Sequence, residues 1–185
     1  LVDEHYYTSP EWMLANCHRY DNMPSDGPKV FLGEYASWGN TYYNALIEAA
    51  YMTGLENNAH AIGLVCYAPL LCNVDYINWQ PDMIWFDNLN SVRTVSYYVQ
   101  QLYAQNKGTH VLPLTMNKKP VTGAEGQNGL FASAVYDKDK NELIVKVANT
   151  SQTAQPVSLT FEGLKKQDVL SEGRCIQLSS LDQNK

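Results

Sequence analysis

Between Pro28 and the polar residues 37–40 lies the short apolar run Lys29-Val30-Phe31-Leu32-Gly33-Glu34-Tyr35. Its length, its apolar content and the turn-forming residues on both sides predict a buried β-strand. The next segment, from Thr41 to about Asn57, carries apolar residues near helical spacing and predicts an α-helix. A buried strand followed by a helix is the repeating unit of parallel α/β folds.

The same strand–helix order occurs on both sides of this unit. Upstream, Leu1–Tyr7 predicts a strand and residues 10–20 predict a helix that opens with a proline. Downstream, the apolar run Ala61–Ala68 predicts a third strand, and Ser91–Gln105 predicts a third helix after the long aromatic loop Pro69–Leu89. Three such units predict a parallel sheet with helices outside it. The sheet is either open or a piece of a (β/α)8 barrel, which needs eight units and about 250 residues.

The sequence changes character after Lys107. Residues 1–107 hold 4 basic and 11 acidic residues and 18 of the 21 aromatic ones, whereas residues 108–185 hold 9 basic and 8 acidic residues. This contrast predicts two domains with a joint near residues 105–108. Beyond the joint, four short runs predict β-strands that form an antiparallel sheet or sandwich. These runs are Thr109–Thr115, Gly129–Tyr136, Glu142–Asn149 and Val157–Phe161.

Composition excludes several classes of function. The 185 residues include 13 basic and 19 acidic side chains, a net charge of −6, which argues against binding to a nucleic acid backbone. The mean hydropathy of −0.34 and the lack of any apolar run near a span's length of about 18 residues argue against a membrane-spanning segment. No His, Cys or Asp spacing suggests a metal site, and no cofactor is expected.

Glu34 is the strongest candidate for a catalytic residue, because it stands at the carboxyl end of a predicted buried strand. Barrel enzymes build their active sites at that face. The preceding Gly33 lets backbone or substrate come close. His5 ends the neighbouring strand, so both side chains are expected on one rim of the sheet. The alternatives are a Glu34 that begins a solvated loop and a His5 that bonds locally to Asp3 or Glu4.

The loop after the third predicted strand combines aromatic rings with amides and carboxylates. Asn73 and Trp79 represent this composition, which suits sugars because a sugar has apolar faces and a rim of hydroxyl groups. We therefore expect Asn73 and Trp79 to bind substrate. The alternative is that the loop packs over a barrel mouth or against the second domain.

Four blocks of sequence follow one another in a recognisable order. They are Val2-Asp3-Glu4-His5-Tyr6-Tyr7, Lys29-Val30-Phe31-Leu32-Gly33-Glu34-Tyr35-Ala36, Tyr67-Ala68-Pro69-Leu70 and Trp79-Gln80-Pro81-Asp82-Met83-Ile84-Trp85-Phe86-Asp87-Asn88. In this order they resemble the C-terminal portion of glycoside hydrolase family 51, the α-L-arabinofuranosidases. The resemblance covers nearly the whole chain, and four ordered blocks are far more specific than one motif.

The resemblance implies an α/β plus all-β fold. Residues 1–107 would form the last three β/α units of a (β/α)8 TIM barrel. Residues 108–185 would form an antiparallel β-sandwich domain, which we expect to be incomplete. The resemblance also implies a secreted or periplasmic protein and allows a homo-oligomer.

The activity implied is that of a retaining enzyme, which releases terminal α-L-arabinofuranosyl residues from arabinose-containing oligo- or polysaccharides such as arabinan by double displacement. Glu34 would be the nucleophile, and His5 and Tyr7, which match the family's H-x-Y motif, would shape the sugar subsite. The family's acid/base glutamate follows an asparagine at the end of the fourth barrel strand. The pair Asn141-Glu142 is in the β-rich part instead, so the acid/base is expected outside this chain, and the chain alone is expected to be inactive.

Two other functions remain open at the level of sequence. One is a non-catalytic carbohydrate-binding or assembly module, in which the aromatic loop binds the sugar. The other is a different retaining barrel glycosidase, such as a glucanase or xylanase, which shares the same carboxylate geometry.

Overall fold

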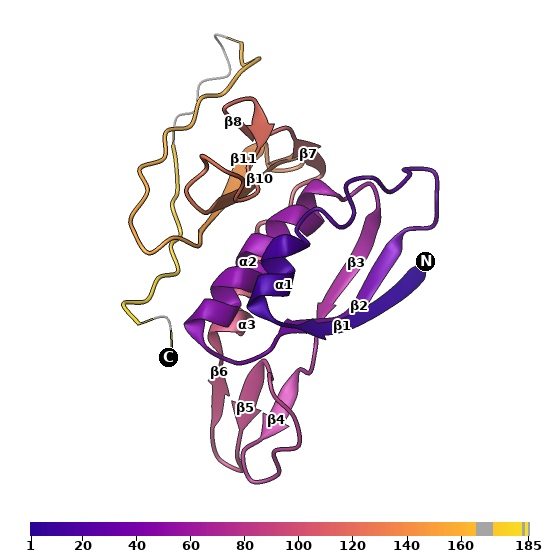
Figure 1. The fold of residues 1–185 in the computed structure, drawn as a ribbon, viewed down its shortest axis with the longest axis vertical. Coiled ribbons are helices and arrows are strands. Elements are labelled where there is room, and N and C mark those ends of the chain that lie inside the picture. The colour runs from indigo at the N-terminus through magenta and orange to yellow at the C-terminus, as the bar shows by residue number, and fades with distance from the viewer. Residues whose placement is uncertain (166–171, 183, 185) are drawn as a thin grey trace.

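The first part of the chain is a parallel sheet of three strands in the order β1-β2-β3, seen at the right of Figure 1. The computed structural model describes residues 1–165, 172–182 and 184. The strands of this sheet are β1 (Val2–Thr8), β2 (Val30–Ser37) and β3 (Ile62–Tyr67). Both strand pairs are parallel, which confirms the direction predicted from the alternation of strands and helices.

Three helices pack beside this sheet, namely α1 (Pro10–Ala15), α2 (Tyr42–Asn57) and α3 (Val95–Gln105). The residue before each helix is Ser9, Thr41 or Thr94, in that order. Its hydroxyl oxygen accepts a hydrogen bond from a backbone N–H of the helix's first turn. The prediction of a helix to Tyr20 is wrong, because the chain leaves helical geometry at Asn16 and continues in turns.

The predicted loop Pro69–Leu89 contains regular structure that the sequence did not reveal. A small sheet in the order β4-β5-β6 is built from β4 (Leu71–Asn73), β5 (Ile84–Phe86) and β6 (Ser91–Arg93). It extends from the lower end of the molecule in Figure 1. The third helix therefore starts at Val95 rather than Ser91. Strands of three residues are too short to show a period of two, which is why the pattern missed them.

The second part of the chain contains an antiparallel sheet in the order β11-β10-β7 and a small hairpin. The sheet consists of β7 (His110–Leu112), β10 (Leu130–Asp137) and β11 (Glu142–Asn149), and the hairpin of β8 (Thr115–Met116) and β9 (Lys119–Pro120). Asp137 pairs with Glu142, so β10 and β11 form a hairpin, which confirms the antiparallel arrangement predicted for these runs. The strand predicted at Val157–Phe161 is wrong. Its apolar side chains are exposed, and within the described residues no strand pairs with it.

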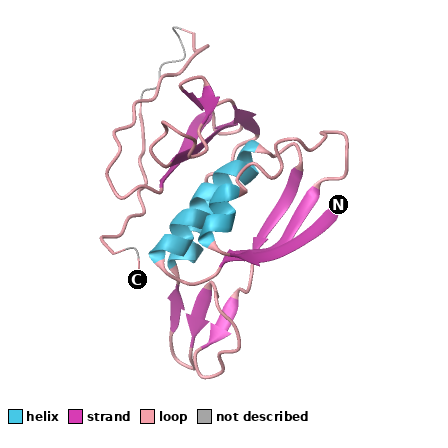
Figure 2. Ribbon diagram, in the orientation of Figure 1, coloured by secondary structure: helices cyan, strands magenta, loops and turns pink. Residues whose placement is uncertain are grey.

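Helix α2 lies between the two sheets and packs on both, against β2 on one side and β10 and β11 on the other (Figure 2). Side chains of β2 and α2 such as Leu32, Tyr35 and Ile47 are fully buried there. At the far side of α2, Glu56 forms an ion pair with Lys146 and accepts the Ser133 hydroxyl at 2.5 Å. Phe131 of β10 and Ala148 of β11 belong to the same buried apolar cluster, so α2 joins both parts of the chain by apolar packing and by the polar contacts of Glu56.

The outer edges of the parallel sheet carry no partner strand among the described residues, since β1 and β3 are its two ends. Leu64 on β3 is 54% exposed and Val2 on β1 is 46% exposed. Unpaired edges and exposed apolar side chains on a parallel sheet are unusual, because such sheets are normally covered on both faces.

Candidate active site

Glu34 lies near the carboxyl end of β2, directly opposite His5 of β1. The register pairs His5 with Glu34 and Tyr7 with Ala36, after an irregularity between Glu4 and His5. Residues paired across a parallel ladder project to the same face, and so do residues two apart on one strand. The backbone therefore brings His5, Tyr7 and Glu34 to one face of the sheet, and His5 and Glu34 lie near the same rim, as expected from the sequence.

Gly33 makes room for this arrangement. A Cβ atom at this position would lie 2.7 Å from Nε2 of His5 and would also collide with the carboxylate of Asp3. Atoms that close would have to move apart. The glycine thus lets the side chains of Asp3 and His5 lie flat across β2, immediately beside Glu34.

Each carboxylate oxygen of Glu34 faces a different partner. The hydroxyl of Tyr7 donates a hydrogen bond of 2.6 Å to Oε2. Nδ1 of His5 lies 3.9 Å from Oε1, a contact that is attractive when the imidazole is protonated. Since the Glu34 side chain is 43% exposed, the carboxylate is oriented by its neighbours and still open to a reactant.

His5 is itself oriented by Asp3, whose Oδ2 lies 3.1 Å from Nε2. An Nε2–H that bonds to Asp3 leaves Nδ1 of the neutral ring as an acceptor facing Glu34, whereas a protonated ring presents an N–H to both carboxylates. The local pairing with Asp3 and the contact with Glu34 therefore occur together and are not alternatives.

Tyr7 is held as a hydrogen-bond donor. Burial, the hydrogen bond to Glu34 and the negative charges of Glu34 and Asp82 all raise the pKa of the Tyr7 hydroxyl above its usual range. The phenol therefore keeps its proton at neutral pH. A neutral donor 2.6 Å from Oε2 of Glu34 fixes the orientation of that carboxylate.

Three aromatic rings form a cluster beside Glu34. The Trp79 ring lies 5.2 Å from the Tyr7 ring and 5.0 Å from the Trp38 ring, measured between centroids. Tyr7 and Trp38 are 6.0 Å apart. Trp38 and Trp79 are 45% and 42% exposed, so the cluster presents an open aromatic face next to the carboxylate.

Asn73 stands apart from this group. It ends β4, and its Oδ1 accepts the backbone N–H of Asp75 at 3.0 Å. Among the contacts of the described residues, none joins Asn73 to His5, Tyr7 or Glu34. The structure thus brings together four of the five residues singled out from the sequence and leaves Asn73 in the small sheet.

The sequence pattern indicates Asp3 only as a local partner of His5 and does not single out Trp38. Asp3 precedes His5 by two residues on a strand and so projects to the same side. Trp38 follows β2 in an irregular loop, and no local signal indicates that it meets Trp79 from another loop. Asp82 belongs to the aromatic loop, but its sequence position gave no sign that it is buried, at 3% exposure, with its charge acting on Tyr7.

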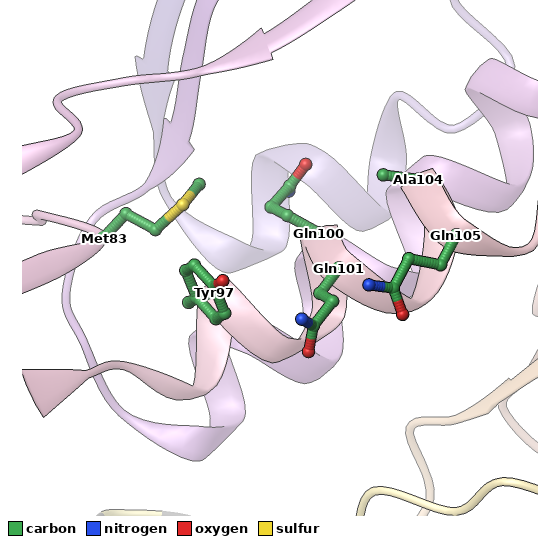
Figure 3. Close-up of a pocket in the computed structure, with 6 residues that line it drawn as sticks. All are labelled: Met83, Tyr97, Gln100, Gln101, Ala104 and Gln105. Atoms are coloured by element: carbon green, nitrogen blue, oxygen red, sulfur yellow. The ribbon is translucent and has the colours of Figure 1, made fainter.

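An open groove of about 280 Å³ lies elsewhere, along α3 (Figure 3). It shares no lining residue with the Glu34 group. Met83 and Tyr97 face it from one end, and the side chains of Gln101 and Gln105 line it along α3. Among the described residues, no cluster of three or more His, Cys, Asp or Glu side chains could hold a metal ion, and no helix has the length and apolar character of a membrane span.

Comparison with known proteins gives consistent matches. The family described as the α-L-arabinofuranosidase C-terminal domain matches residues 33–184. An extracellular exo-α-L-arabinofuranosidase of Streptomyces chartreusis is 49% identical over 145 residues, 76% of this chain and 18% of that protein. α-L-Arabinofuranosidase 1 of Arabidopsis thaliana is 31% identical over 169 residues, 88% of this chain and 24% of that protein.

A solved structure agrees with these sequence matches. An arabinose-bound α-L-arabinofuranosidase of glycoside hydrolase family 51 has a TM-score of 0.74 and 30% identity, over 83% of this chain and 26% of that one. The chain thus spans about a fifth to a quarter of the length of the proteins that it matches. Since the family match covers most of the chain and the sequence and fold comparisons agree, the chain belongs to the α-L-arabinofuranosidase C-terminal domain family.

Proposed function

We propose that this chain is the C-terminal part of a retaining α-L-arabinofuranosidase and supplies the nucleophile of the reaction. The observation that carries the proposal is the environment of Glu34. This carboxylate lies near the carboxyl end of a parallel strand, accepts a hydrogen bond from Tyr7, faces His5 and adjoins an open aromatic face. The names of the matched relatives support arabinofuranosides as the substrate class.

In the proposed reaction an oxygen of Glu34 attacks the anomeric carbon of an α-L-arabinofuranosyl unit. The bond to the leaving oxygen breaks, and that oxygen takes a proton from a second carboxylic acid. Water then gives a proton to the same second carboxylate and attacks the anomeric carbon. The bond between that carbon and Glu34 breaks, and arabinose leaves with its configuration retained. Tyr7 and His5 hold the Glu34 carboxylate in position for the attack.

The second carboxyl group is assigned to a part of the protein outside this chain. In a retaining enzyme it stands about 5–5.5 Å from the nucleophile. Asp3 is engaged by His5, and the Asn141-Glu142 pair belongs to the β10–β11 hairpin. The chain without the acid/base is therefore proposed to be inactive towards substrates with poor leaving groups.

We assign the sugar subsite to His5, Tyr7 and Trp79, with Asn73 at its outer rim. Trp79 and Trp38 would contact an apolar sugar face, while Tyr7 and His5 reach the hydroxyls next to the reacting carbon. Asn73 reaches the sugar in this proposal only through a longer substrate, because its side chain lies in the small sheet.

We further propose that residues 1–107 are the last three units of a (β/α)8 barrel and that residues 108–185 belong to a β-sandwich domain. The parallel order β1-β2-β3, its unpaired edges and the exposed Leu64 support the first part, because additional strands would cover them. The antiparallel β11-β10-β7 sheet supports the second. The extracellular relative from Streptomyces chartreusis supports the proposal that this protein is secreted. We also propose that it associates into a homo-oligomer.

The proposal is tested in the complete protein that contains this chain, with an aryl α-L-arabinofuranoside as substrate. Glu34→Ala is expected to lower kcat by about a thousandfold or more, since no other group can form the ester. Glu125→Ala, in an exposed loop of the second part, is the matched control and should leave kcat unchanged. Normal activity of Glu34→Ala would refute the assignment. Hydrolysis of aryl xylosides or glucosides instead would favour another retaining glycosidase.

A further inference from the structure

The loop between β2 and α2 is rigidly held from the helix side. The side-chain amide of Asn44, in the first turn of α2, donates to the carbonyl of Trp38 at 2.7 Å and to the Ser37 hydroxyl at 2.8 Å. Its carbonyl oxygen accepts the backbone N–H and the hydroxyl of Thr41. Gly39 adopts a φ of +118°, where a Cβ would also collide with Asn44. The backbone that carries Trp38 is thus fixed.

Asn40, in the same loop, bridges to a distant part of the chain. Its Nδ2 donates to the backbone carbonyl of Asp82 at 2.8 Å, and its Oδ1 accepts the Asp82 backbone N–H at 3.1 Å. The side-chain amide therefore pairs with both polar groups of one residue, as a neighbouring β-strand would. The pair spans 42 positions of sequence.

The segment that Asn40 holds is the one that carries Trp79. Among the hydrogen bonds of the described residues, the two from Asn40 are the only ones to the backbone of residues 77–82. The nearest other backbone hydrogen bonds are made by the N–H groups of Tyr76 and Met83, on either side of this stretch. The Trp79 ring nevertheless lies 5.0 Å from the Trp38 ring and 5.2 Å from the Tyr7 ring, measured between centroids. These contacts require that the backbone of residues 77–82 be held in place.

We propose that Asn40 is a positioning residue that holds Trp79 against Trp38 and Tyr7, and thereby maintains the aromatic face beside Glu34. This inference rests on the proposed function for its kinetic consequence. Asn40 acts through the backbone of Asp82, on the segment that ends three residues after Trp79. Its effect is on the shape of the sugar subsite, while the bonds that form and break belong to Glu34.

The chemistry of the contact requires an amide of this length. An aspartate in this place could accept the Asp82 N–H but could not donate to the Asp82 carbonyl. It would also add a negative charge beside the buried carboxylate of Asp82, whose pKa burial already raises. Alanine would remove both bonds and leave a backbone N–H and a carbonyl without partners.

The experiment uses the complete protein and the variants Asn40→Ala and Asn40→Asp. Asn106→Ala is the control, because its Nδ2 makes a comparable bond of 2.8 Å to the Leu102 carbonyl at the end of α3, away from the Glu34 group. The first readout is the circular-dichroism signal that arises from the coupling of the Trp38 and Trp79 indole rings, called the couplet. It is measured as the difference between the spectra of the wild type and of Trp79→Phe. The second is KM and kcat for arabinofuranosyl oligosaccharides.

Both Asn40 variants are expected to lose the couplet as Trp79→Phe does, and to raise KM by about tenfold with kcat changed by less than about threefold. Asn106→Ala should retain the couplet and the KM of the wild type. A wild-type couplet in both Asn40 variants would overturn the inference, and so would a wild-type KM. If the wild-type protein hydrolysed no arabinofuranoside, the proposed function would fail, while the couplet would still decide the role of Asn40.

Discussion

The hydroxyl of Tyr7 lies 2.6 Å from Oε2 of Glu34, across two paired parallel strands. Burial and the Glu34 charge keep this hydroxyl protonated, so the bond joins a neutral donor to a carboxylate. Hydrogen bonds to charged groups are worth about 1.5–3 kcal/mol, more than those between neutral groups. The relationship explains how a carboxylate that is partly open to solvent can be held in one orientation.

Tyr7→Phe removes this hydrogen bond and retains the ring that contacts Trp79. We expect kcat/KM of the complete protein for an aryl α-L-arabinofuranoside to fall by about 10- to 100-fold, which corresponds to the energy of the lost bond. Tyr98→Phe, on the outer side of α3, is the control and should have no effect. A Tyr7→Phe protein with wild-type kinetics would mean that the bond to Glu34 does not serve the reaction.

Gly33→Ala tests the close approach of Asp3 and His5 to β2. The new Cβ would collide with Oδ1 of Asp3 and lie 2.7 Å from Nε2 of His5, so both side chains must leave their present positions beside Glu34. We expect a clear loss of activity and only a small loss of stability, because the atoms that must move are the exposed ends of two side chains. Gly173→Ala introduces the same methyl group where nothing lies within 4 Å, and should change neither the melting temperature nor kcat. Equal behaviour of the two variants would contradict the packing described here.

Glu48 makes the stability of the protein depend on pH. This side chain of α2 is fully buried, and burial raises its pKa from the ordinary 4.5 to about 7, although the Ser37 backbone N–H and the Ser96 hydroxyl oppose the shift. The folded state therefore binds this proton more tightly than the unfolded state. Its contribution to stability is full below pH 4.5 and declines as the pH rises to about 7.

Glu48→Gln removes the ionisation and keeps the size of the side chain. As the pH rises from 4.5 to about 7, the free energy of unfolding of the wild type is expected to fall by on the order of 3 kcal/mol relative to that of this variant. Thermal melts of both proteins across this range provide the measurement. Parallel curves, with a constant difference in melting temperature at every pH, would show that Glu48 ionises normally in the folded protein.

The ion pair between Glu56 and Lys146 is expected to join the two parts of the chain. Both side chains are largely buried, at 16% and 11% exposure, and Lys146 also lies 5.1 Å from the centroid of the Tyr103 ring. Lys146→Ala leaves the Glu56 carboxylate buried without its cation, which costs about 3–5 kcal/mol. Lys140→Ala removes an exposed lysine from its pair with Asp137, whose carboxylate keeps the backbone N–H groups of residues 139 and 140 as partners, and should cost about 1 kcal/mol or less. Equal melting temperatures for the two variants would argue against a structural role for Lys146.

The sequence was most informative where a pattern is repeated over many residues. Strand β2 starts within one residue of its predicted start but ends two residues later than predicted, at Ser37. Helix α2 starts within one residue of its predicted start and ends at Asn57, as predicted. The direction of the strands and the common face of His5 and Glu34 follow from the same strand–helix order. These features depend on local periodicity and chain connectivity, which the sequence contains directly.

Other features depend on contacts that no local pattern encodes. The meeting of Trp38 with Trp79, and of Asn40 with Asp82, joins loops about 40 residues apart. The strand predicted at Val157–Phe161 has suitable residues and lacks a partner in the described part of the chain, so propensity alone was insufficient. Asn73 was selected by the composition of its loop, which does not determine the direction of a side chain.

The central claim is that Glu34 forms the bond to the sugar, and azide rescue of Glu34→Ala in the complete protein tests it most directly. Azide can enter the space of the missing carboxylate and attack the anomeric carbon from the same side. The account predicts that added azide restores turnover of an aryl α-L-arabinofuranoside and that NMR identifies the product as the β-L-arabinofuranosyl azide. Undiminished hydrolysis by Glu34→Ala, with free arabinose as the product and no effect of azide, would contradict it.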